Sequence, residues 1–320
     1  MHEMTHSPVL KSTSFFVLLF ITHLFSSAQD STISFEGKTI TLTEVIVRSN
    51  INVPAFIERV KADTTFYKAF RNLRVLGFTS LNDIRMMNKK GAVKASLESR
   101  TKQHASGGCR ITEVLEEKTS GDFYNRKHEY NYYTAELYAG LFFAWDTVCG
   151  ETNIVKGTEL STKGKSGMAR HKEQLKMLFF NPGKKIPGIP LMGNKVAVFD
   201  EENAALYDFV IDMEERQGKT FYVFKVKAKE GLSGGKKNKV VIDEMTTWFD
   251  YRSFEVLARN YSMSYDAGVY DFDVQMEVQM TKYVDYLVPS LLRYTGNWDV
   301  IFKKKERGVF TATLFDFAGD

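Results

Sequence analysis

Cysteine, proline and histidine are scarce in this chain of 320 residues, with 2, 6 and 6 copies respectively. No stretch contains the about 20 consecutive apolar residues that a membrane-spanning helix needs. No charge sign dominates either, because acidic and basic residues are interspersed and the formal charge at pH 7 is +4. This mild excess, without a recognisable nucleic-acid-binding motif, argues against nucleic acid as a partner.

Chemically active groups are also few in the part of the chain that follows residue 28. Its histidines are His104, His128 and His171, and each has polar or charged neighbours, which predicts surface positions. We identify no constellation of nucleophile, base and orienting group there. The expectation is a protein without enzymatic activity, cofactor or metal.

The first 28 residues have the organisation of a secretory signal peptide. Lys11 supplies a positive charge, residues 15–25 form a short apolar run, and residues 26–28 are small, as a signal peptidase requires. We expect cleavage after Ala28 and therefore export. An uncleaved signal anchor is the alternative.

The two cysteines are Cys109 and Cys149. In an exported protein an even pair suggests a disulfide. The bridge would close a loop of about 40 residues, which is worth about 3–4 kcal/mol in the chain-entropy model. Two buried thiols are the alternative, and no ligand spacing near either cysteine indicates a metal.

The clearest pattern is a strict alternation over residues 270–280, where every even position is apolar and every odd one is polar. Successive side chains of a strand point to opposite faces, so this segment predicts one long, half-buried β-strand. The same pattern recurs over residues 206–317 with short links, which join antiparallel neighbours. We expect a meander of about seven strands there, with a bulge at Gly296 and Asn297.

The preceding half mixes helices and strands. Residues 29–50 predict an N-terminal β arm, and apolar spacings of three or four predict a helix over residues 54–74, with a candidate break at residues 63–65. Strands are expected at residues 78–87, 92–103 and 110–118, the first two joined by a turn at residues 88–91. Residues 122–148 are rich in aromatics with a mixed period, which leaves helix and strand open.

The middle of the chain carries a proline-rich segment. A helix is expected over residues 168–180, and residues 181–193 then hold three of the 6 prolines. This composition predicts an irregular loop. The loop is apolar, so it is either a lid over an apolar site or a plain connection.

These elements predict an α+β, mainly β fold. A large curved antiparallel sheet, an open half-barrel that contains the C-terminal seven-strand meander, is covered by a few helices. One domain is expected over residues 51–320, with a helix-and-strand half at residues 51–200 and the meander at residues 206–317.

The inward face of the meander is the candidate site, because methionine and aromatic side chains suit adaptable contact with lipid chains. The same composition is normal for a fully packed core, so both interpretations stay open. Met213, Met245 and Tyr261 share this face. The candidate ligand contacts are Tyr207, Phe209, Tyr222, Phe224, Phe249, Met263, Tyr270, Phe272, Met276 and Met280.

Three short segments of the meander resemble successive strand motifs of the outer-membrane lipoprotein carrier and receptor superfamily (LolA/LolB-like). They are residues 222–226 (YVFKV), 248–250 (WFD) and 287–289 (LVP). The order of elements over residues 54–317 is also similar to that family. The resemblance implies a curved half-barrel whose concave face is closed by helices and holds lipid chains. The chain departs from the family in its longer middle segment and in lacking a lipidated cysteine.

Residues 42–47 resemble β-domain tails of Bacteroidota envelope proteins, which implies the periplasm or the periplasmic face of the outer membrane. We therefore expect a non-enzymatic binding or carrier protein that shields lipid, or the acyl chains of a lipoprotein, in an apolar cavity under the sheet. An envelope protein is a further candidate partner. The alternatives are a structural or interaction module of the envelope with a fully packed core, and an outer-membrane β-barrel, whose strands also alternate.

Overall fold

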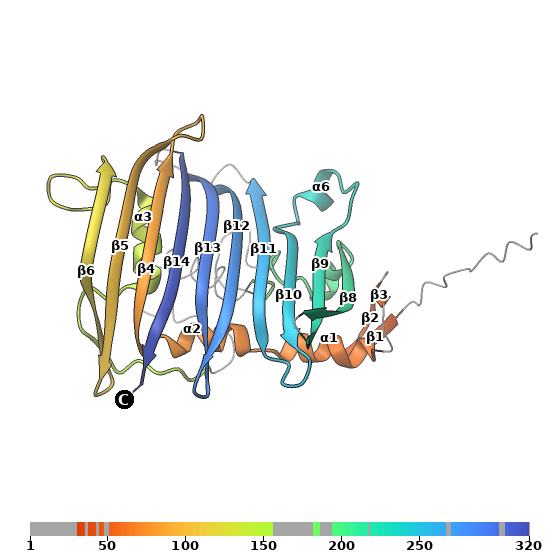
Figure 1. The fold of residues 1–320 in the computed structure, drawn as a ribbon. Helices are drawn as coiled ribbons and strands as arrows, with labels where there is room; N and C mark the ends of the chain where they lie inside the picture. Colours follow the sequence, from red (N-terminus) through yellow and green to blue (C-terminus); the bar gives the residue numbers. More distant parts are fainter. Residues whose placement is uncertain are drawn as a thin grey trace, which may run out of the picture.

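One open, mainly antiparallel sheet forms most of the molecule (Figure 1). The computed structural model describes residues 31–35, 38–42, 45–47, 51–155, 182–185, 194–216, 218–266, 270–300 and 305–319. Within these ranges the sheet has 12 strands, in the order β3-β8-β9-β10-β11-β12-β13-β14-β4-β5-β6-β7. The expected open, curved sheet covered by helices is confirmed.

The strand bounds are β3 (Val45–Val47), β4 (Gly77–Met87), β5 (Val93–Ser106), β6 (Cys109–Gly121), β7 (Val148–Cys149), β8 (Tyr207–Arg216), β9 (Lys219–Ala228), β10 (Ile242–Asp250), β11 (Val256–Asp266), β12 (Tyr270–Tyr283), β13 (Tyr286–Val300) and β14 (Glu306–Ala318). A separate hairpin pairs β1 (Ser31–Phe35) with β2 (Lys38–Leu42). The helices are α1 (Val53–Ala62), α2 (Thr65–Asn72), α3 (Tyr133–Phe142) and the short α5 (Glu201–Ala204) and α6 (Gly234–Lys237).

The C-terminal meander predicted by the alternation is confirmed, since β8 to β14 are consecutive antiparallel neighbours. The sheet continues past its last strand, because β14 pairs with β4 and places Phe310 opposite Ile84. The hairpin of β4 and β5, with β6 beyond it, therefore belongs to the same sheet as the meander. On the other side β3 extends the sheet by pairing parallel to β8.

A row of aromatic and aliphatic side chains crosses the concave face of this sheet. Pairing registers place its members opposite one another on nine successive strands, from β8 to β5, and each is at most 5% exposed. Asp273 and Gln275, on the alternate face of β12, are exposed, as the alternation predicts. We call this set the inner row: Phe209, Val226, Met245, Tyr261, Met276, Tyr294, Phe310, Ile84 and Leu97.

Helices α1 and α2 lie across one end of the strands (Figure 1), and we call this end the base. The break expected at residues 63–65 is confirmed, because α1 ends at Ala62 and α2 begins at Thr65. Asp63 Oδ1 accepts hydrogen bonds from Thr65 N at 3.0 Å and from Thr65 Oγ1 at 2.7 Å. The first of these bonds satisfies a backbone N–H at the start of α2 that a continuous helix would have paired with a backbone carbonyl.

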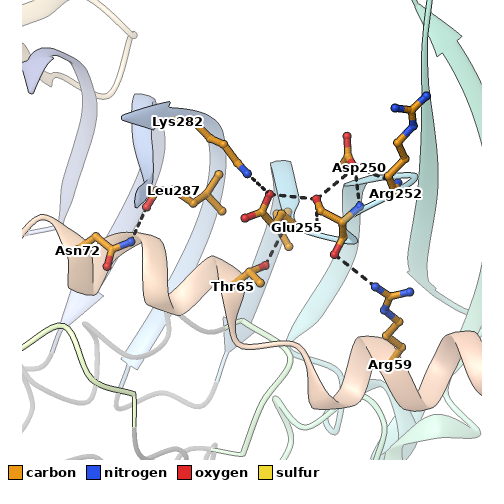
Figure 2. A network of polar contacts seen from close by, with 10 residues as sticks. Arg59, Thr65, Asn72, Asp250, Arg252, Glu255, Lys282 and Leu287 are labelled. Atoms are coloured by element: carbon orange, nitrogen blue, oxygen red, sulfur yellow. Dashed lines mark hydrogen bonds and ion pairs between the residues drawn. The ribbon is translucent and has the colours of Figure 1, made fainter. Parts of the chain in front are cut away.

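Figure 2 shows how this base is fastened to the strands. Val256 N donates to Thr65 Oγ1 at 3.1 Å, and Asn72 Nδ2 donates to Leu287 O at 2.8 Å inside the core. Arg59 reaches the β10–β11 turn through Ser253 O at 3.3 Å. Both helices are therefore tied to the β10–β11 connection, and α2 is also tied to the start of β13.

A disulfide between Cys109 and Cys149 joins β6 to β7 at the same end. The chain beyond it follows α2, where Glu151 pairs with Arg110 at 2.6 Å and with Arg74 at 3.0 Å. Arg71 Nη2 donates to Thr152 O at 2.6 Å. The bridge therefore begins a segment that supports the outer side of α2.

The aromatic-rich region, for which the sequence did not distinguish helix from strand, contains helix α3. Glu306 accepts hydrogen bonds from Tyr133 N at 3.0 Å and Thr134 N at 2.7 Å, which fixes the start of the helix on β14. Tyr138 then packs on two members of the inner row, 4.5 Å from the Tyr294 ring and 5.3 Å from the Phe310 ring between centroids.

Two expectations about individual residues are wrong. The register of β12 with β13 is continuous at Gly296 and shifts between Gln279 and Met280 instead. A Cβ at position 296 would lie 2.2 Å from Tyr294 Oη, so this glycine makes room for a ring and forms no bulge. Met213 is 40% exposed, because it lies in the second half of β8, where no residue from Asp212 onward is buried.

Some predicted features lie outside the described residues. These are the signal peptide and its cleavage site, the helix at residues 168–180, and the proline-rich segment apart from residues 182–185. Residues 231–238, which join β9 to β10, are described and contain the short helix α6.

Candidate functional site

The candidate ligand contacts fall into two groups, and the first is covered by protein. Phe56 of α1 lies 5.3 Å from Tyr222, 5.8 Å from Phe224 and 6.2 Å from Phe249 between ring centroids. Phe199 stacks on Phe209 at 5.7 Å. This part of the inner face, from β8 to β10, is therefore an aromatic core.

Tyr207 belongs to the same covered group. It is 2% exposed, and burial raises the pKa of its hydroxyl to about 12, so it remains neutral. Its place on β8 beside Phe209 assigns it to the aromatic core.

The second group lies on β11 and β12. Met263, Phe272 and Met276 are 0%, 5% and 5% exposed, and Met280 is half-buried. Phe272 contacts the Trp298 ring at 5.2 Å. The side chain of Tyr270 lies outside the described residues. This group lines the central inner face, where methionine is concentrated.

A pocket of about 700 Å³ opens at the end of the strands opposite the base, and we call this end the rim. Its floor includes Phe272 and Tyr265 from the inner face. Its walls are polar, with six carboxylates against four lysine and arginine side chains. The carboxylates belong to Asp243, Asp266, Asp271, Asp273, Asp299 and Glu306, and the cations to Lys89, Lys237, Lys305 and Arg307.

Asp243 is a partly buried carboxylate of the rim. Burial raises its pKa, and the neighbouring Asp273 adds to the effect, while a hydrogen bond from Ser264 Oγ at 2.8 Å opposes it. The rim therefore carries negative charge, and one of its carboxylates, that of Asp243, is partly desolvated.

The sequence did not lead us to a positively charged group at the base. Arg259 of β11 is 6% exposed and points inward, with its Cζ 4.2 Å from the centre of the Phe66 ring of α2. Its Nε donates to Thr247 Oγ1 at 2.9 Å. The signal that could have found it is its phase, since it shares the odd-numbered inward positions of β11 with Tyr261 and Met263.

Lys184 joins Arg259 from the described part of the proline-rich segment. Gly183 beside it has a φ of 84°, and a Cβ there would lie 3.2 Å from Met245 Cε, so the backbone lies directly on the inner row. Lys184 Nζ donates to the carbonyl of Lys61 at the end of α1. Burial, followed by the charge of Arg259, lowers the pKa of Lys184 to about 8.

Two letter patterns match catalytic motifs that we had not expected. Residues 2–6 read HEMTH, but they precede the predicted cleavage site and lie outside the described residues. Residues 231–235 read GLSGG, which fits G-x-S-x-G. Ser233 is exposed beside the short helix α6, and the described histidines, His104 and His128, are on other segments. The geometry is not the strand-to-helix elbow that activates a serine.

Neither metal clusters nor membrane-spanning helices occur in the described part of the chain. No group of three or more His, Cys, Asp or Glu side chains there could hold a metal ion. No helix within the same ranges is long and apolar enough to cross a membrane.

Comparison with known proteins finds solved structures of low similarity. No family model matches the chain, and no curated protein does. A domain provisionally assigned to an outer membrane lipoprotein-sorting protein from Vibrio parahaemolyticus is similar at 11% identity and a TM-score of 0.27, over 82% of this chain and 89% of that one. A DUF1329 family protein from Desulfovibrio piger is similar at 10% identity and a TM-score of 0.24, over 80% of this chain and 94% of its own. Neither score is high enough to identify a function.

Proposed function

We propose that this chain is a non-enzymatic carrier of the cell envelope that shields lipid, or the acyl chains of a lipoprotein, against the inner face of its sheet. The supporting observation is the inner row, which presents nine mostly apolar side chains on one curved, open sheet. Burying an acyl chain gains about 0.8 kcal/mol for each methylene, so about ten methylenes suffice for useful affinity. The methionines of β10 to β12 can adapt their shape to such a chain.

The proposed location is the periplasm or the periplasmic face of the outer membrane. The signal peptide predicted at residues 1–28 supports export, and the disulfide fits an oxidising compartment. Release of the cargo would require α2, or the proline-rich segment, to move off the inner row. In this proposal the segment acts as a lid.

A packed interaction module is the second candidate, and a specific observation favours it. The rings of Phe56 and Phe199 pack on the inner face from β8 to β10. In that case only the edges and turns of the sheet would meet an envelope partner.

The two candidates are separated by extracting lipid from the purified protein and by titrating it with a fluorescent fatty-acid probe. The carrier proposal expects bound lipid and saturable binding of the probe. Met276→Trp, which fills the centre of the inner face, should abolish binding, whereas Val284→Trp at a position 74% exposed should not. A protein that is always empty and never binds the probe would leave the packed module as the function.

A further inference from the structure

Two cations, the buried Arg259 and the partly buried Lys184, lie at the base of the inner face, and we call them the base cations. Arg259 is less than one-tenth exposed, and Lys184 is held against the end of α1. Burying a charge without a partner is costly, so such groups are normally paired or bind an ion. The base cations therefore require an explanation that an apolar core does not provide.

Within the described residues, the guanidinium of Arg259 has the Phe66 ring on one face and few hydrogen-bond acceptors. Arg259 donates from Nε to Thr247, and within the described ranges neither of its two Nη atoms has a hydrogen bond or an ion pair. Lys184 has a backbone carbonyl as its acceptor. The carboxylate that acts on both is that of Asp63, and its Oδ1 is already engaged by Thr65. Lys61 adds a third positive charge near Lys184, and it is itself paired with Glu58 at 2.9 Å.

The surroundings of the base cations fit an amphiphile. Tyr261 and Met263 follow Arg259 at the next two inward positions of β11, and Val278 lies directly opposite it on β12. The rim at the other end of the strands carries six carboxylates, which would repel an anion. A charged headgroup would therefore be favoured at the base, with an apolar chain along the inner row.

We propose that Arg259 and Lys184 bind the anionic headgroup of the cargo, a phosphate or another singly or doubly charged oxyanion at the end of an alkyl chain. This inference rests on the proposed carrier function and names the class of lipid. The guanidinium offers two parallel N–H donors, which match two oxygens of one anion. Lys184 would supply a further charge-assisted hydrogen bond.

The test compares three probes by calorimetric titration: monododecyl phosphate, dodecan-1-ol and inorganic phosphate. The expected result is that the full mature protein binds monododecyl phosphate at least about tenfold more tightly than the alcohol, a difference of about 1.4 kcal/mol. Arg259→Met should reduce this preference to less than about twofold and leave alcohol binding unchanged. Arg259→Lys should retain part of this preference, because lysine keeps the positive charge but lacks the two parallel N–H donors of the guanidinium. Arg252→Met, at an exposed arginine, is the matched control and should keep the whole preference.

The possible outcomes separate the two proposals. Equal affinity for phosphate and alcohol overturns the headgroup site and keeps the carrier, whereas binding of neither amphiphile overturns both. Inorganic phosphate binding as tightly as the alkyl phosphate would indicate a free-anion site and overturn the lipid assignment. If Arg259→Met does not fold, Lys184→Met takes its place, and an undiminished preference in it counts against the site.

A pH series with dodecane-1-sulfonate, whose charge does not titrate, provides an independent readout. The preference for sulfonate over alcohol should fall between pH 7 and pH 10, because Lys184 loses its proton there. The charged groups that face Lys184 are Arg259 on β11 and Lys61 and Asp63 at the end of α1. Lys184→Arg should keep the preference at pH 9, which lies below the value of about 10 to which burial lowers the pKa of Arg259. A flat profile in the wild type would contradict the role of Lys184.

Discussion

The base and the rim of the sheet are built from the same strands and differ in charge and in packing. At the base, α1, α2 and the disulfide close the structure, and the charges buried there are positive. At the rim a pocket of about 700 Å³ remains, and the excess charge is negative. The difference shows how one run of alternating strands can have a closed cationic end and an open anionic end, because the alternation fixes only which side chains point inward.

Removing the main aromatic contact of the base should have the largest effect on stability. Phe56 is 6% exposed and touches four rings, so Phe56→Ala should cost about 3–5 kcal/mol in the free energy of unfolding. Chemical denaturation monitored by circular dichroism measures this. Val284→Ala, at an exposed turn, should change stability by less than about 0.5 kcal/mol. Equal effects of the two variants would show that α1 does not cover the sheet as described.

Opening the disulfide should affect the base slightly less. Cys109→Ser combined with Cys149→Ser should cost about 3–4 kcal/mol, because the unfolded chain regains the freedom of a loop of 40 residues. Thermal unfolding with and without a reductant checks the value, and reductant should affect only the wild type. A wild-type protein indifferent to reductant would mean that the bridge does not form in solution.

Nearer the rim, Gly296→Ala should cost about 1–3 kcal/mol, because the new methyl group overlaps Tyr294 and forces the ring to move. The same substitution in a Tyr294→Leu background should cost less. Urea denaturation of the four proteins gives this double-mutant cycle. An identical cost in both backgrounds would place the role of Gly296 in its backbone.

The smallest effect is expected from Asp243→Asn at the rim. The pKa of this carboxyl is raised in the folded protein, so its ionisation opposes folding. Wild-type stability should therefore lose a contribution as the pH rises from the unfolded-state pKa of about 3.9 through the folded value. The asparagine variant should lack this loss, so its stability relative to the wild type should increase over that interval. A constant difference across the titration would show that Asp243 is not desolvated.

The meander could be predicted from sequence because residues 270–280 alternate strictly, the other strands within residues 206–317 follow the same pattern, and their links are short. The pairing of β14 with β4 could not, since it joins residues that are more than 200 positions apart and depends on the closure of the whole sheet. Gly296 was misread because a glycine in a strand indicates either a bulge or a close approach, and only the position of Tyr294 decides between them. The inward methionines and aromatics were identified correctly for the most part, whereas Arg259 was missed because charge was taken as a sign of the outer face.

The place of β14 between β13 and β4 has a consequence for the order of folding. The inner edge of β4 stays unpaired until the last strand of the chain, Glu306–Ala318, is available. Since β4 and β5 are adjacent in sequence and can pair before β14 is made, the edge of β4 lacks its partner while more than 200 further residues are synthesised. Truncating the C-terminal strand should therefore leave unpaired edges on β13 and β4, which are sites for aggregation.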